Sequence, residues 1–395
     1  MIRHAEAEGN IYRRAHGHVN GQIIGRGLKQ IEQLKERFLS VDVDAVYSSD
    51  LTRAQITASA IAEPRNLPIN TTQMLREVKM GVWEDITWGN MEYHEPELGR
   101  YFTTDPARWI VEGSETFGQV QERMLECIGA IAERHDGGCI AVFSHGFAIR
   151  AFMCALMNVA SHESMKVPYC DNTAVALLEY NSGLFNIIYQ SDNSHLAKET
   201  STFANQTWWR GEKEQVRENM RIEQFDIQRD KELLELCRLE QNAETNTSQN
   251  AEAYPDIQGI ISDFHFRTLD NDGPFKAYTA FFTDEPAGLI LYEIREGSLN
   301  DFVDQEHGGS NATHGVEGRF GLIKFIYMRE KFRRKGFGVQ LLGQVVSDFR
   351  NMGCETLQII VPADCGAEGF CLKYGFVKSG EAGSLCVMEK NIKNW

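Results

Sequence analysis

Short apolar runs that end in polar residues alternate, in the first half of the chain, with segments whose apolar residues recur at helical spacing. The runs "DAVYSSD" (44–50) and "CIAVFSHG" (139–146) each precede such a helical segment. Two further apolar runs predict strands at 163–180 and 184–190. A strand, a polar tip and a helix in this order are typical of an α/β domain, in which sites form beyond the carboxyl ends of the strands.

The second half of the chain returns to this α/β pattern after a break. Residues 197–218 have no clear period and become highly charged, so we predict a linker there, between domains at 1–196 and 219–395. We expect Trp208 and Trp209 of this linker to pack on a domain face.

The same patterns predict the elements of the second domain. A strand and an amphipathic helix occupy 220–241, and a polar loop follows at 242–252. The later part predicts strands at 277–283, 288–294 and 322–328, a helix at 339–349, a strand at 355–362, and a helix that ends in a turn at 369–377.

Composition narrows the class of protein. The chain has 395 residues, which predicts more than one domain, and a formal charge of −16, which argues against non-specific binding to nucleic acid. Nine scattered cysteines indicate reduced thiols, and no apolar run reaches the ~18 residues typical of a membrane span. We therefore expect a cytoplasmic protein with no membrane or nucleic-acid partner. His307 and His314 lack neighbouring cysteines or spaced carboxylates, so no metal site is predicted.

Charged and imidazole side chains occupy the expected strand tips of the first domain. They are Arg3, His4, Arg53 and His145, with Glu77 in "LREVKMGVWED". Guanidinium groups pair with phosphate oxygens, and a neutral imidazole can attack phosphorus. A second imidazole can stabilise charge on the equatorial oxygens, and a carboxylic acid can protonate the leaving oxygen. This set of residue types is suited to phosphoryl transfer.

Five segments match sequence motifs of the histidine phosphatase (phosphoglycerate-mutase-like) superfamily, and they occur in the same order, so residues 1–196 resemble that family. The segments are "IRHAEAEGN", "YSSDLTRAQITA", "LREVKMGVWED", "EGSETFGQVQERM" and "VFSHGFAIRAF". The resemblance implies a three-layer α/β fold and a small phosphate ester as substrate, hydrolysed without a metal. It implies His4 as the nucleophile, Glu77 as the general acid and base, and a phosphate pocket made by Arg3, Asn10, Arg53 and His145.

Departures from the family pattern leave alternatives open. The family usually has glycine where this chain has Ala5, and we expect the added methyl group close to the phosphate pocket. Met1 and Ile2 are too few for a strand of typical length, ~5–6 residues, which indicates a sequence that starts late. The alternatives are an inactive, phosphate-binding regulatory module and a phosphoglycerate-type mutase. Only 37 residues separate Glu77 from Glu115, which leaves little chain for the insertion of the mutases and favours a phosphatase.

A glycine turn, "RRKGFG" (333–338), lies between the predicted strand at 322–328 and the helix that follows. Glycine lets the backbone approach an anion closely, and the start of a helix offers unpaired N–H groups. Basic residues around the turn concentrate positive charge in an otherwise acidic domain. These features predict a binding site for a pyrophosphate.

This turn resembles the acetyl-CoA motif of the GNAT-type N-acetyltransferases, and the later segments "ETLQIIVP" and "GFCLKYGFV" extend the resemblance over about residues 220–395. It implies an α/β fold with a mixed sheet, acetyl-CoA as cofactor and an amine as acceptor. The family's acid, often a tyrosine, falls at Cys371, with Tyr374 as the alternative, and Lys324 stands where some members carry a glutamate base. The implied cofactor-binding residues are Met328, Arg333, Arg334, Lys335, Gly336, Phe337 and Gly338. Together the two resemblances predict a bifunctional enzyme.

Overall fold

The computed structural model describes residues 1–206, 219–247, 275–298, 317–363, 366–382 and 385–393. The chain divides into two compact units, Met1–Glu218 and Asn219–Asn394. Within the described ranges every cysteine is a free thiol, and no helix combines the length and the apolar character needed to cross a bilayer. Outside those ranges lie Trp208, Trp209, His307 and His314.

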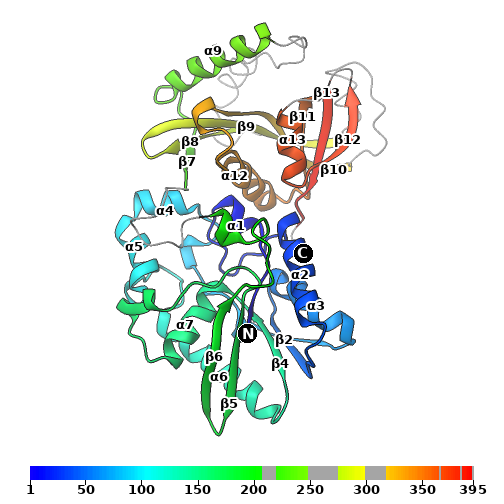
Figure 1. Ribbon diagram of the computed structural model, residues 1–395. Coiled ribbons are helices and arrows are strands. Elements are labelled where there is room, and N and C mark those ends of the chain that lie inside the picture. Colours follow the sequence, from blue (N-terminus) through cyan, green and yellow to red (C-terminus); the bar gives the residue numbers. More distant parts are fainter. Residues whose placement is uncertain (207–218, 248–274, 299–316, 364–365, 383–384, 394–395) are drawn as a thin grey trace. The chain divides into compact units, whose positions relative to one another are not determined.

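The first unit is built on a six-stranded sheet (Figure 1). In spatial order its strands are β3 (Ile69–Thr72), β2 (Ala45–Ser49), β4 (Ile140–Ser144), β1 (Ile2–Arg3), β5 (Val175–Asn181) and β6 (Leu184–Asp192). The strands from β3 to β1 are parallel, and β5 and β6 are antiparallel to their neighbours. Arg3 lies opposite Ser144, and Ser48 opposite Phe143. The carboxyl ends of β1, β2 and β4 therefore meet at one edge of the sheet.

Helices cover both faces of this sheet and complete three layers. α2 and α3 share an apolar cluster with Val46 and Phe143, whereas α6 and α7 share another with Tyr47 and Val142. Successive strand residues thus supply opposite faces, and the predicted three-layer α/β fold is confirmed. The helices are α1 (Glu8–Tyr12), α2 (Gly25–Phe38), α3 (Thr52–Ala62), α4 (Trp88–His94), α5 (Pro96–Thr104), α6 (Phe117–Arg134), α7 (Gly146–Leu156) and α8 (Thr202–Asn205), with the short 3₁₀ helices η1 (Glu63–Arg65), η2 (Gln73–Leu75), η3 (Gly81–Trp83), η4 (Pro106–Arg108) and η5 (Ser161–Lys166).

The strand predicted at 163–180 is shorter in the structure. Only β5 is extended, and the first part of the segment forms η5 and a loop. Polar contacts hold this loop, because the Asp171 carboxylate accepts hydrogen bonds from Asn172 N at 2.8 Å and from Ser201 Oγ at 2.6 Å. An apolar run was therefore not sufficient evidence for a strand here.

The segment predicted as a linker begins with ordered structure. Residues 197–206 contain α8, and Gln30 Nε2 donates to Thr200 O at 2.7 Å and to Thr202 Oγ1 at 3.1 Å. Both threonines are buried in the first unit. This segment shows no period in the sequence because polar side chains, and not an apolar stripe, hold it. Residues 207–218 lie outside the described ranges.

The second unit contains a seven-stranded sheet. In spatial order the strands are β12 (Val377–Ala382), β13 (Leu385–Asn391), β11 (Thr356–Pro362), β10 (Glu317–Met328), β9 (Glu285–Ser298), β8 (Phe275–Phe282) and β7 (Arg221–Gln224). β10 and β11 pair in parallel and the other neighbours pair antiparallel, so the mixed sheet is confirmed.

The helices that the structure describes in this unit are α9 (Lys231–Thr247), α12 (Gly338–Asn351) and α13 (Gly366–Lys373), with the 3₁₀ helix η7 (Glu330–Phe332). α9 runs on to Thr247, so the first part of the loop predicted at 242–252 is helical. The residues there, "QNAETNT", carry no apolar stripe, yet glutamine, alanine and glutamate are compatible with helix.

Gly321 on β10 allows α12 to lie directly on the sheet. A Cβ atom at this position would lie 2.2 Å from ring atoms of Phe349, which is fully buried on α12. The close packing of this helix, whose first residues follow the glycine turn, therefore requires glycine at position 321.

We expect Gly321→Ala to lower the free energy of unfolding of the second unit by roughly 1–3 kcal/mol, the usual cost of overpacking a core. Gly129→Ala in α6 is the matched control, because a Cβ there meets nothing within 4 Å. It should stabilise the first unit by about 0.5–1 kcal/mol. Thermal unfolding of both variants measures the difference. A Gly321→Ala protein that unfolds like the wild type would show that α12 can move away without cost.

Candidate active sites

Strand ends deliver four of the predicted site residues to one edge of the first sheet. Arg3 ends β1 and His4 follows it, while His145 caps α7 directly after β4. Arg53 lies in the first turn of α3, after β2. All four side chains are buried, with exposed fractions from 0% to 7%, and the ring centroids of His4 and His145 are 5.1 Å apart. The four groups therefore form one buried cluster.

Hydrogen bonds fix which nitrogen of each imidazole carries the proton. His4 Nδ1 lies 2.7 Å from the carbonyl oxygen of Ala5, which can only accept, so Nδ1 carries the proton and Nε2 keeps its lone pair. His145 Nδ1 accepts a hydrogen bond from Arg53 Nε at 3.2 Å, so its proton lies on Nε2. That Nε2 is buried and has no protein partner. The cluster thus presents one nucleophilic nitrogen and one N–H donor.

Both imidazoles are held in the neutral form. Burial, and then the charges of Arg53 and Arg3, keep the pKa of His4 well below its usual value of 6.5. Burial and Arg53 lower the pKa of His145 in the same way. A cationic surrounding disfavours a second cation, and it equally favours a bound anion.

The two arginines differ in how many of their donors the protein itself uses. Besides the bond to His145, the Nη atoms of Arg53 donate to three carbonyl oxygens of the loop 16–19 at 2.8–3.1 Å. Arg3 Nη1 donates to Cys170 O at 2.7 Å, while the buried Nε of Arg3 has no partner. Burial lowers the pKa of Arg53 to about 10, so this group stays charged at neutral pH. Arg3 therefore has more free donors for an anion.

Glu77 reaches the same cluster from an irregular segment after η2. Its Oε1 accepts from Ala148 N at 2.9 Å and from Val78 N at 3.0 Å, and its Oε2 accepts from Phe147 N at 3.1 Å. The carboxylate therefore lies at the N-terminus of α7, the helix that His145 caps. The structure brings this predicted acid to the edge where the cationic cluster lies.

The structure gives the contacts of two residues of the predicted pocket, Asn10 and Ala5, and Asn10 as a phosphate contact stays a prediction. The side-chain oxygen of Asn10 accepts from Ala7 N at 3.0 Å, and no contact described for Asn10 joins it to the cationic cluster. Ala5, whose methyl group we expected close to the pocket, is fully buried and packs in the apolar cluster with Ile2 and Leu34. The methyl group is thus accommodated in the core, because Ala5 follows the last residues of a central strand.

Sequence reasoning missed the side chains that hold the backbone around His4. Asn172 Nδ2 donates to the carbonyl oxygen of His4 at 2.9 Å, and Thr57 Oγ1 accepts from Ala5 N at 2.8 Å. Both side chains are completely buried. Asn172 lies in the segment that was predicted as a strand, where its sequence gave no signal of this role. Thr57 follows Arg53 by one helical turn, a spacing that could have placed it beside the site.

The glycine turn of the second unit connects the end of β10 to the start of α12. Gly336 has φ +79° and Arg334 φ +62°, so both adopt the left-handed conformation that the turn requires. The ladder between β10 and β11 ends at Ile323, where β10 has a bulge, and beyond it the two strands make no pair with each other. The turn and the separated strand ends form one side of the candidate cofactor site.

Three of the basic residues near this turn, Arg329, Lys331 and Arg333, contact acidic or carbonyl groups of the protein. Arg329 Nη1 contacts Glu285 at 2.7 Å, and Lys331 pairs with the same carboxylate. Arg333 Nε donates to Met328 O at 2.7 Å, and its Nη2 lies 3.2 Å from Glu240. Among the basic residues near the turn, Arg334 and Lys335 are the exposed ones for which no partner is described. Arg333 is therefore part of the internal support of the turn.

The candidate acids of the second unit are close in sequence but differ in environment. Cys371 is buried in α13, and Tyr374 packs its ring edge-on against Phe370, with the centroids 4.9 Å apart. Lys324, at the position of the expected base, lies at the bulge of β10, with its Nζ 3.8 Å from the buried carboxylate of Glu293. The choice between Cys371 and Tyr374 stays a prediction.

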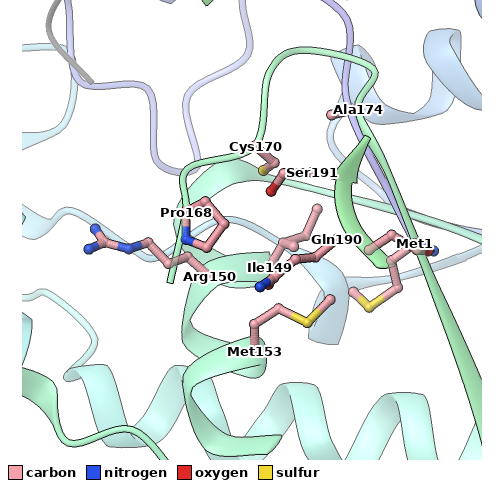
Figure 2. Close-up of a pocket in the computed structure, with 10 residues that line it drawn as sticks. Met1, Ile149, Arg150, Met153, Pro168, Cys170, Ala174, Gln190 and Ser191 are labelled. Atoms are coloured by element: carbon pink, nitrogen blue, oxygen red, sulfur yellow. The ribbon is translucent and has the colours of Figure 1, made fainter. Parts of the chain in front are cut away.

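A small cavity lies beside the first site, and none of the predicted catalytic or phosphate-binding side chains lines it. Figure 2 shows its lining between α7 and the strands, with the guanidinium of Arg150 directed away from the other labelled side chains. Cys170, whose carbonyl oxygen binds Arg3, forms part of the wall. Among the described residues, no group of three His, Cys, Asp or Glu side chains is arranged to hold a metal ion.

Comparison with known proteins identifies both units. A family model of the histidine phosphatase superfamily (branch 1) matches residues 1–193, and one of the acetyltransferase (GNAT) family matches residues 234–376. The chain is 27% identical to phosphoserine phosphatase 1 of Hydrogenobacter thermophilus over 198 residues, which are 50% of this chain and 93% of that protein. It is 29% identical to the metal-independent phosphoserine phosphatase of Arabidopsis thaliana over 200 residues, 50% of this chain and 82% of that protein.

Among solved structures, the chain is similar to Bacillus stearothermophilus YhfR, with 29% identity and a TM-score of 0.48 over 49% of this chain and 96% of that one. The family models match residues 1–193, which contain all six strands of the first sheet, and residues 234–376, which contain β8 to β11 of the second sheet. The chain therefore joins a histidine phosphatase superfamily domain to a GNAT-family acetyltransferase domain.

Proposed function

We propose that the first unit hydrolyses phosphate monoesters through a phosphohistidine at His4. The observation that carries this proposal is the hydrogen bond from His4 Nδ1 to Ala5 O, which leaves Nε2 as the reactive nitrogen of a buried, neutral imidazole. In the first step Nε2 forms a bond to phosphorus while the bond to the ester oxygen breaks. Glu77, in its protonated form, gives its proton to the departing alkoxide.

In the second step water is the nucleophile, and Glu77 acts as a base. Glu77 accepts a proton from a water molecule, whose oxygen attacks the phosphohistidine, and the P–N bond breaks to release inorganic phosphate and neutral His4. In both steps the free N–H donors of Arg3 and the Nε2–H of His145 would bind the equatorial oxygens, where charge develops. None of the groups in this scheme requires a metal ion.

The relatives named above favour a small phosphorylated metabolite, such as phosphoserine, as the substrate class. The position of Ala5 in the core favours an active pocket over the alternative of an inactive regulatory module, because the methyl group does not occupy the site. A phosphoglycerate-type mutase remains the third alternative, and it would transfer phosphate within one sugar acid.

For the second unit we propose transfer of an acetyl group from acetyl-CoA to an amine. The turn at Gly336 and the N-terminus of α12 would bind the pyrophosphate through backbone N–H groups, assisted by Arg334 and Lys335. Glu240 and Met328 support this arrangement, because they hold Arg333 and with it the path of the turn.

We expect His4→Ala to reduce hydrolysis of an aryl phosphate by at least about 1,000-fold, since no other group can take over as nucleophile. The wild type, quenched during turnover, should carry a phosphoryl group that is labile in acid and stable in base. His135→Ala is the control, because this histidine contacts Tyr47 outside the cluster. An active His4→Ala protein would exclude the phosphohistidine. Phosphate transfer between positions of a sugar acid would instead support the mutase.

The pH dependence should reflect the lowered pKa of His4. The neutral imidazole is the reactive form, and its pKa lies well below 6.5, so the acid-side loss of kcat/KM should occur below pH 6.5. Titration of the imidazole by NMR should give the same value, and Arg53→Gln should raise it, because one neighbouring cation is removed. An imidazole that titrates at or above 6.5 in the wild type would contradict the assignment.

Gly336→Ala should weaken binding of acetyl-CoA by about 10-fold or more, because a side chain strains the turn and approaches the pyrophosphate. Gly353→Ala is a matched control, since the two glycines have φ values of +79° and +77° and neither Cβ would meet an atom within 4 Å. Only Gly336 lies in the turn, whereas Gly353 follows the other end of α12. Calorimetry with acetyl-CoA measures both. Equal affinities for the two variants would remove the turn from the cofactor site.

A further inference from the structure

The segment that carries Glu77 is irregular, yet side chains form hydrogen bonds with its backbone carbonyl groups. From the last two residues of η2 onward, the carbonyl oxygens of the four consecutive residues 74–77 each accept a side-chain hydrogen bond. Ser144 Oγ binds one of them, the carbonyl of Leu75, at 2.8 Å. The other three are bound by Arg123 of α6. An exposed loop would satisfy these carbonyls with water, so their protein partners indicate a fixed conformation.

Arg123 uses all five of its N–H donors in this region. Its Nη1 donates to Met74 O at 2.9 Å and to Arg76 O at 2.8 Å, and its Nη2 donates to Glu77 O at 3.0 Å. The remaining two donors, on Nε and Nη2, bind the Glu115 carboxylate at 2.7 and 2.9 Å. A planar guanidinium with five donors in fixed directions can make this set of contacts, and no other side chain can.

Glu115 in turn binds the chain on the other side of Glu77. Its Oε2 accepts from Lys79 N at 2.9 Å, and Glu115 N donates to Lys79 O at 3.0 Å. Although burial opposes ionisation, the hydrogen bonds from Arg123 and Lys79 keep the pKa of Glu115 below its usual value. The ion pair therefore fixes the backbone from residue 74 to residue 79, with Glu77 inside this stretch.

We propose that Arg123, oriented by Glu115, is a positioning residue for the acid Glu77. This inference rests on the function proposed for the first unit. The carboxylate of Glu77 is fixed at one end by the N–H groups of Phe147 and Ala148. At the other end Arg123 binds the carbonyl oxygens of residues 74, 76 and 77, whereas His18 Nε2, at 2.9 Å, contacts only the carbonyl of Glu77. Loss of the second anchor lets the carboxyl group move away from the leaving oxygen while the nucleophile, His4, keeps its own contacts.

The chemistry of the leaving group provides the readout. An aryl phosphate departs as a stable phenolate and needs little help from an acid, whereas an alkyl phosphate departs as a basic alkoxide and needs a proton. A well-placed general acid contributes about 100-fold or more. A displaced Glu77 should therefore slow the first step, phosphorylation of His4, strongly with alkyl phosphates and weakly with aryl phosphates. A general loss of structure would slow both equally.

The experiment compares kcat/KM of the full chain for p-nitrophenyl phosphate and for an alkyl phosphate such as phosphoserine. This ratio reports the steps up to phosphorylation of His4 and leaves out the attack of water, in which Glu77 would act alike for both esters. Arg123→Lys keeps the charge but has at most three donors, and we expect a loss of about 100-fold with the alkyl ester and less than about 10-fold with the aryl ester. Arg65→Lys is the matched control. Arg65 also donates to three backbone carbonyls, those of Phe38, Val41 and Ile61, but away from the site. It should leave the ratio of the two rates unchanged.

Glu115→Gln and a double variant complete the test. Glu115→Gln should produce the same leaving-group pattern in a milder form, and it serves if Arg123→Lys does not fold. In a Glu77→Gln background, Arg123→Lys should cause little further loss with the alkyl ester, because the group that it positions is already absent. Equal losses for both esters, or additive losses in the double variant, would overturn the inference. Failure of the proposed function itself would be recognised separately, by an active His4→Ala protein.

Discussion

The hydrogen bond between His4 Nδ1 and the carbonyl oxygen of Ala5 sets the tautomer on which the chemistry proposed for the first unit depends. A carbonyl only accepts, so its direction sets the tautomer and leaves the opposite nitrogen for attack. Much of the surrounding structure keeps that carbonyl in place. Thr57 binds Ala5 N, Asn172 binds His4 O, and the Ala5 methyl group is packed in the apolar core. The orientation of the proposed nucleophile is thus set by the backbone at the end of a short central strand.

The sequence predicted the parts of the site that depend on strand order. Arg3, His4, Arg53 and His145 each follow an apolar run, and the parallel register of β1, β2 and β4 brings such positions to one edge. It could not predict the direction of the Ala5 methyl group or the partner of Asn10, because these depend on side-chain geometry within a single turn. Nor could it predict Asn172, which approaches His4 from 168 residues further along the chain.

A similar limit applies to the glycine turn of the second unit. Counting basic residues near "RRKGFG" overstated the free positive charge, since Glu285 neutralises Arg329 and Lys331, and Glu240 contacts Arg333. Both acids are distant in sequence, on β9 and α9. What the pattern gave correctly was the order of strand, turn and helix, because it follows from local residue types. Arg329 and Arg333 show that a basic residue near a binding motif can stabilise the fold of the motif and need not bind its ligand.

The ordered stretch at 197–206 affects where the first domain can be separated from the rest of the chain. The sequence pattern alone places the boundary at 196, but a cut there would remove both acceptors of the buried Gln30 Nε2 and the Ser201 hydroxyl that donates to the buried Asp171. A buried polar group without a partner costs about 1–3 kcal/mol. Gln30 also holds Glu6 N, two residues after His4. An excised phosphatase domain should therefore extend at least to residue 206, and one that ends earlier would lose stability and activity for reasons unrelated to its catalytic residues.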